Sequence, residues 1–165
     1  MKEMYEKTSS SRAGEIGSYI FTILVTFANL IFFAFYHRYI AWFTTEPDGN
    51  VTRLAMLIDK YFIWLPIAIT ASILAIIAYT ILIFYDNDRF RMTVEIIVIT
   101  TGVVVAASLA SIYPFDFSVI PNATAVDVVP IVVRVFFITL AVFYGVTALV
   151  QFIKLRRYIA KQEVK

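Results

Sequence analysis

The sequence predicts an all-α integral membrane protein, with four transmembrane helices in an antiparallel bundle. Hydrophobic residues make up 61% of the 165 residues, whereas a soluble domain is only about half apolar. Four apolar segments each reach the roughly 20 residues that a helix needs to cross a hydrocarbon core of about 30 Å. Most Lys and Arg residues fall on one side of the membrane when the chain is threaded through it four times.

The four spans are placed by counting about 20 residues from each charged or turn-rich boundary. They cover about residues 18–38, 64–85, 92–112 and 130–153. The rest of the chain consists of two tails, 1–17 and 154–165, and three connections. We therefore expect residues 1–165 to form a single transmembrane domain.

The distribution of Lys and Arg predicts the orientation. Of the 14 Lys and Arg residues, ten lie in the first tail, in the 86–91 turn and in the last tail. The opposite side carries Arg53 and Lys60, with Arg38 and Arg134 at its boundary. Because cytoplasmic segments are enriched in Lys and Arg, both termini are expected in the cytoplasm of a multi-pass cell-membrane protein.

The outer connection between the first two spans contains the turn-rich stretch TTEPDGN. After it, Leu54, Leu57, Ile58 and Tyr61 recur at helical spacing. This spacing predicts a short amphipathic helix on the outer surface before the second span. The inner connection is a tight turn, DNDR, which joins the second and third spans as an antiparallel pair. The second outer connection is unusually apolar and is expected to pack back onto the bundle.

Residue types exclude several kinds of site. The chain has no Cys, so disulfides, thiolate metal sites and thiol catalysis are excluded. His37 is the only His, and no acidic cluster stands near it at ligand spacing, so no metal or cofactor is expected. No nucleophile–base set can be assembled, which favours a non-catalytic role. Nucleic-acid binding is not expected, because the basic tail lacks a folded reading element.

Arg134 is unusual because it interrupts the apolar run VVPIVVRVFF. Counting about 20 residues back from Lys154 puts Arg134 at the outer boundary, where its guanidinium can reach headgroups or loop acids. We expect it to anchor the outer loops through acids such as Asp116 and Asp127. The alternative is a lipid or quinone site that Arg134 shares with His37 and Arg38 at similar depth, although an aromatic and basic interface anchor would have the same pattern.

Glu95 is the only acid inside a predicted span. It can act as an ion or proton site together with Thr26 and Asn29, which lie on a polar stripe of the first span. The structural alternative is that Glu95 pairs with Arg91, four residues earlier, near a helix N-terminus that favours negative charge.

Small residues also recur at helical spacing, as Gly102-xxx-Ala106-xxx-Ala110 in the third span and Ala141-xxx-Gly145 in the fourth. Such seams let helices approach closely, and Thr and Asn side chains are expected to hydrogen-bond across them.

Three functions remain open. The first is an accessory or structural subunit of a membrane complex, or a self-associating scaffold, with membrane lipids and other membrane subunits or copies of itself as partners. The second is a small oligomeric transporter or channel that uses Glu95 and the polar stripe. The third is a lipid- or quinone-binding membrane protein.

Overall fold

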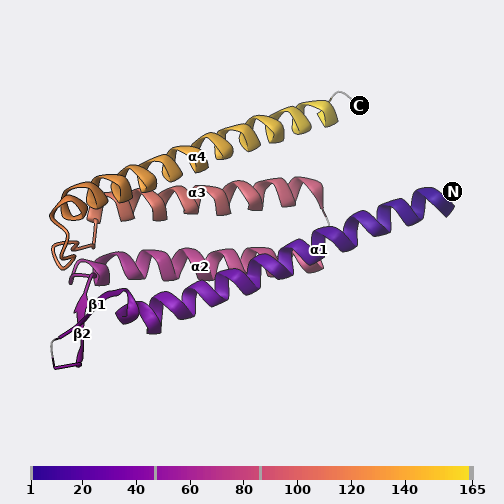
Figure 1. Cartoon of the computed structure of the whole chain (residues 1–165). Helices are drawn as coiled ribbons and strands as arrows, with labels where there is room; N and C mark the ends of the chain where they lie inside the picture. Colours follow the sequence, from indigo (N-terminus) through magenta and orange to yellow (C-terminus); the bar gives the residue numbers. More distant parts are fainter. Residues whose placement is uncertain (1, 47, 86, 164–165) are drawn as a thin grey trace.

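The computed structural model describes residues 2–46, 48–85 and 87–163, so residues 1, 47, 86, 164 and 165 of the predicted tails and connections lie outside it. Within these residues the chain forms helices and one β-hairpin (Figure 1). The helices are α1 (Lys2–Ile31), α2 (Tyr61–Phe84), α3 (Asp88–Ile112) and α4 (Ala123–Glu163). A π-helical turn, η1 (Phe32–Tyr36), and a 3₁₀ turn, η2 (His37–Tyr39), extend α1. The strands are β1 (Ala41–Thr45) and β2 (Val51–Ala55).

Four helical segments of the described chain are long and apolar enough to cross a membrane. They are Arg12–Tyr39, Tyr61–Phe84, Asp88–Ile112 and Ala123–Gln162. The prediction of four apolar helices of membrane-crossing length is therefore confirmed. Their positions agree with counting from charged boundaries because charged residues are costly inside an apolar span and so mark its ends.

The chain reverses direction between consecutive helices, and each helix packs beside the next (Figure 1). The helix pair α1–α2 lies beside the pair α3–α4, and α2 contacts α3 between them. In contrast, α1 and α4 hardly touch each other. Figure 1 shows the start of α1 and the end of α4 at one end of the molecule, the termini end, and the β-hairpin at the other, the hairpin end.

The predicted amphipathic helix after the first span is wrong. Residues 51–55 form strand β2 instead, which pairs antiparallel with β1 and places Arg53 opposite Phe43. A backbone hydrogen bond from the Met56 N–H to the Ile40 carbonyl (3.3 Å) continues the pairing toward the helices.

Local chemistry explains why the hairpin forms. The strand sequences AWFTT and VTRLA are rich in β-branched and aromatic residues, which favour strands. Gly49 has a φ of +85°, the left-handed conformation that a tight hairpin turn requires. Leu57 and Ile58 follow β2 and bond to the second outer connection, with Leu57 bridging Phe115. The helical spacing of Leu54, Leu57 and Ile58 is therefore accidental, because Leu54 pairs within the hairpin whereas Leu57 and Ile58 contact the second outer connection.

Helix α4 begins at Ala123, earlier than the predicted start near residue 130. The Asn122 side-chain oxygen accepts a hydrogen bond from the Ala125 N–H (3.1 Å), as expected of a helix N-cap. Pro130 lies inside the helix and did not stop it. Asp127, predicted to lie in a loop, is therefore helical.

Two buried clusters hold the helices together. The cluster at the hairpin end contains Tyr61, Trp64, Ala68 and Leu109. The cluster at the termini end contains Tyr19, Leu82 and Val94. The side chains between these clusters do not fill the space between the helices.

Candidate binding cavity

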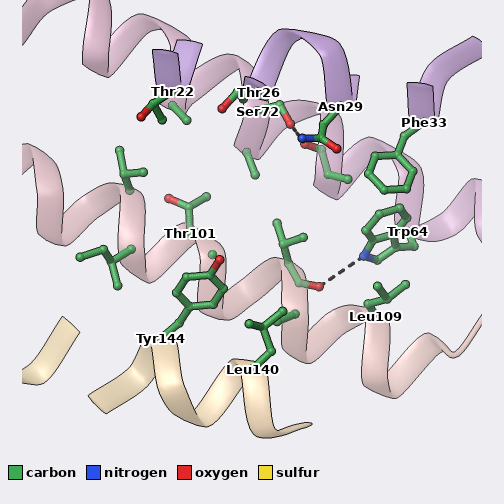
Figure 2. Close-up of a pocket in the computed structure, with 18 of the residues that line it drawn as sticks. Thr22, Thr26, Asn29, Phe33, Trp64, Ser72, Thr101, Leu109, Leu140 and Tyr144 are labelled. Carbon is green, nitrogen blue, oxygen red and sulfur yellow. Dashed lines mark hydrogen bonds between the residues drawn. The ribbon is translucent and has the colours of Figure 1, made fainter. Parts of the chain in front are cut away.

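A cavity of about 590 Å³ lies between the two buried clusters and is lined by residues of all four helices (Figure 2). We call it the central cavity. Along α2 its lining runs from Trp64 to Tyr79, which corresponds to about 22 Å of helix. Its volume falls within the roughly 300–1,000 Å³ of typical ligand pockets.

A row of polar side chains lines the cavity from three helices. They are Thr22, Thr26 and Asn29 of α1, Ser72 of α2 and Thr101 of α3. Thr22, Asn29, Ser72 and Thr101 each donate a hydrogen bond of 2.6–2.9 Å to the carbonyl four residues earlier on their own helix. The sequence predicts that such side chains bond across the helices, but these four hydrogen bonds stay within one helix. Their donors are used locally, while oxygen lone pairs are left to face the cavity.

The hydrogen bonds between the described helical segments come from aromatic residues and from two arginines, Arg12 and Arg91, instead. The Tyr61 hydroxyl donates to the Phe33 carbonyl (2.6 Å) and the Trp64 indole donates to the Val105 carbonyl (3.3 Å). At the termini end, the Arg12 guanidinium donates to the Leu82 carbonyl (3.0 Å). These bonds fix the helices at both ends of the cavity and leave its middle open.

Tyr144 carries α4 into the cavity lining, and Figure 2 shows its ring reaching toward Thr101. A Cβ at Gly102 would lie 3.6 Å from the Tyr144 ring, which is an ordinary van der Waals contact, so the ring lies against this position of α3. The small-residue seam of α3 therefore packs against α4. In contrast, a Cβ at Gly145 would meet nothing within 4 Å.

Aromatic side chains close the cavity toward the hairpin end. Phe33 meets Trp64 edge-to-face with 5.5 Å between ring centroids, and Trp64 lies beside Tyr61 at 5.8 Å. Phe115 stacks on Phe137 at 5.9 Å on the α4 side. We call Phe33, Tyr61 and Trp64 the aromatic layer.

None of the charged residues that the structure describes lines the central cavity. Glu95, which the sequence grouped with Thr26 and Asn29, is half-buried on α3 outside the lining. Nor does Arg91 pair with it. Arg91 forms ion pairs with Glu15 of α1 and with Asp88, each at 2.7 Å. Among the described residues, Glu95 has no hydrogen bond or ion pair.

Arg134 also contacts a different partner from those expected. Its guanidinium lies over the ring of Tyr113, 4.7 Å from the centroid, and within the described chain it forms no ion pair with Asp116 or Asp127. Asp116 instead accepts a hydrogen bond from the Ser118 N–H (2.9 Å). Hydrogen bonds from the Ser118 side chain and backbone hold the pKa of Asp116 below its usual value.

His37 and Arg38 line a second, smaller pocket under the β-hairpin, away from Arg134. The structure therefore does not bring the predicted group together: His37 and Arg38 share this pocket, and it is not lined by Arg134, Asp116 or Asp127. Arg53, for which the sequence predicts no site, lines the same small pocket. The strand-like composition on both sides of PDGN is the signal that could have placed Arg53 there.

The sequence predicts only part of the lining of the central cavity. The α1 stripe was recognised, whereas Ala68, Ala71 and Ala75 of α2, which also line the cavity, were not. Their spacing of three and four residues puts small side chains on one face of α2 and is the signal that was missed. Among the described residues no group of His, Asp and Glu is arranged to hold a metal ion. Comparison with known protein families, curated proteins and solved structures finds no match.

Proposed function

We propose that the chain is a multi-pass membrane protein that binds one apolar, chain-like lipid molecule in its central cavity, without catalysing a reaction. In this proposal the four helices cross the bilayer as an antiparallel bundle, with both termini in the cytoplasm and the β-hairpin outside. The observation that carries it is a cavity of about 590 Å³ that all four helices line. Its length along α2, about 22 Å, suits an extended acyl or isoprenoid chain.

The lining indicates the chemistry of the ligand. Because it carries no charged group, an ionised headgroup inside it would lose its hydration without gaining a counter-ion. The ligand buried there is therefore an uncharged chain. The hydroxyl oxygens of Thr22, Ser72 and Thr101 can accept a hydrogen bond from one neutral polar group, such as an alcohol.

Two features favour binding over transport or catalysis. The aromatic layer closes the hairpin end of the cavity, so a solute would need that layer to move before it could cross. The polar groups in the lining are hydroxyls, an amide and an indole, which do not form an acid–base pair at physiological pH.

Native mass spectrometry of the protein purified in mild detergent tests the proposal. The wild type is expected to retain one lipid molecule per chain. Ala71→Phe, which fills the cavity from α2, should lose it. Ala107→Phe is the matched control, because Ala107 is exposed and outside the lining. Equal retention by both variants, or no retained lipid in the wild type, would contradict the proposal.

The orientation can be tested separately, because the chain has no Cys. A single Cys introduced by Asn50→Cys in the hairpin turn should react with a membrane-impermeant thiol reagent on intact cells. One introduced by Arg89→Cys, in the first turn of α3, should react only after the membrane is opened. The reverse pattern would overturn the proposed orientation.

Association with other membrane subunits or copies of the chain is a second candidate function, favoured by the surface of α4. Its apolar stretch contains no buried residue, and open space faces Gly145. A partner helix could approach closely at that point. Gly145→Leu should then convert an oligomer to a monomer in mild detergent, whereas Val146→Leu, at an exposed neighbouring position, should not. A wild type that is monomeric without a partner would exclude this candidate.

A further inference from the structure

The second pocket, of about 160 Å³, lies beside the hairpin and is lined by residues of η2, β2 and the start of α2. We call it the hairpin pocket. Its polar lining consists of His37, Arg38, Arg53 and Asp59. A water molecule occupies about 30 Å³ in the liquid, so the pocket has room for roughly five waters or for one tetrahedral oxyanion.

The hairpin is what brings the two arginines together. Arg38 lies at the end of the first apolar helix, and Arg53 stands in strand β2. Strand β2 runs antiparallel to β1, with Arg53 opposite Phe43, so the chain returns toward the end of η2. Arg38 and Arg53 thus line one pocket although a turn separates them in the sequence.

His37 supplies an unsatisfied donor or acceptor. Its ring stacks on Tyr61 with 5.0 Å between centroids and meets the edge of Phe62 at 5.7 Å. The Nδ1 atom is buried and has no hydrogen-bond partner in the described part of the chain. Leaving a buried polar atom unpaired is unfavourable, so a bound group that pairs with it would be stabilised.

The charges of the pocket are not neutralised internally. Two arginines face a single carboxylate, Asp59. Between the described residues, neither Arg38 nor Arg53 forms an ion pair with Asp59 or with any other acid. The two arginines therefore exceed the one carboxylate by one positive charge. Guanidinium groups bind phosphate oxygens through paired hydrogen bonds.

We propose that the hairpin pocket binds a phosphate group, with Arg38 and Arg53 holding its oxygens and His37 donating a hydrogen bond from Nδ1. The phosphate belongs either to a lipid headgroup of the outer leaflet or to a free phosphate ion. This site does not depend on a ligand in the central cavity, because the aromatic layer lies between the two. A failure of one proposal therefore leaves the other standing.

Two binding measurements on the full chain in detergent distinguish the sources. Native mass spectrometry compares phosphatidic acid with diacylglycerol, which has the same acyl chains and no phosphate. Isothermal titration calorimetry at low salt measures binding of inorganic phosphate. Preference for phosphatidic acid alone assigns a lipid headgroup, and heat from inorganic phosphate assigns a free anion. Binding in neither measurement overturns the proposal.

Arg53→Gln tests the site itself. Losing a charged hydrogen bond to the phosphate is expected to weaken binding about tenfold or more. Arg89→Gln removes the same charge at the opposite end of the molecule and should bind as the wild type does. His37→Phe keeps the aromatic stacking and should weaken binding through loss of Nδ1. Unchanged thermal unfolding would show that the variants fold. Equal binding by Arg53→Gln and Arg89→Gln would overturn the assignment.

Discussion

The guanidinium carbon of Arg134 lies 4.7 Å from the centroid of the Tyr113 ring. Tyr113 ends α3 with a positive φ of 45°, and its hydroxyl donates to the Pro130 carbonyl at 2.8 Å. Because Pro130 and Arg134 are one helical turn apart, both contacts act on the same stretch of α4. An arginine in an otherwise apolar run therefore ties the end of α3 to the start of α4.

The first prediction concerns this contact. Replacing the partners singly and together, as Arg134→Gln and Tyr113→Leu, should give a coupling energy of about 0.5–1 kcal/mol in the free energy of unfolding. Circular dichroism during unfolding in mixed micelles measures it. The control cycle, Arg134→Gln with Asp127→Asn, should give no coupling. Coupling only in the control cycle would mean that the loop acid, rather than the ring, is the partner.

The second prediction concerns the aromatic layer. Tyr61 is 2% exposed and bonds η1 through the Phe33 carbonyl. Tyr61→Phe keeps the ring but leaves that bond unmade, and should lower the free energy of unfolding by about 1 kcal/mol. Tyr36→Phe is the matched control, because Tyr36 is exposed and forms no hydrogen bond within the described chain. A loss of stability that is the same for both variants would contradict the assignment of this bond.

The third prediction separates two acids near the termini end. Glu15→Gln should destabilise the protein by about 0.5–1 kcal/mol, because Glu15 pairs with Arg91 across α1 and α3 at a partly exposed position. Glu95→Gln should have no effect or be stabilising, since the half-buried Glu95 lacks a close partner in the described structure. Thermal unfolding at low salt measures both. A larger loss of stability for Glu95→Gln than for Glu15→Gln would instead support the pairing of Glu95 with Arg91 that the sequence suggests.

The four long helices could be predicted from the sequence, whereas the β-hairpin and the start of α4 could not be placed from it. Span length and charged boundaries are local properties, so four long apolar helices could be predicted from them. The helical spacing of Leu54, Leu57 and Ile58 hides the hairpin, because the actual contacts of these residues lie on other segments. Only the strand-like composition on both sides of PDGN indicates it. Likewise, counting back from Lys154 put the start of the fourth span near residue 130, whereas the Asn122 cap starts α4 at Ala123 and Pro130 lies inside the helix.

The two pockets show the same limit for functional residues. Thr26 and Asn29 were found because they share one helix face, and they do line the central cavity. Arg53 and His37 come from separate segments, and only the strand register brings them to one pocket. Helical periodicity in a single sequence cannot predict which residues of two strands stand opposite each other.

The occupancy of the central cavity is tested most directly by fluorescence. The chain has two tryptophans, so Trp42→Phe leaves Trp64, which lines the cavity and is 3% exposed. In vesicles of lipid with brominated acyl chains, a chain inside the cavity should quench Trp64 strongly. Adding Ala71→Phe should remove most of that quenching, whereas adding Ala107→Phe should not. Equal quenching in all three proteins would mean that only surrounding lipid reaches Trp64, and would contradict a lipid-binding cavity.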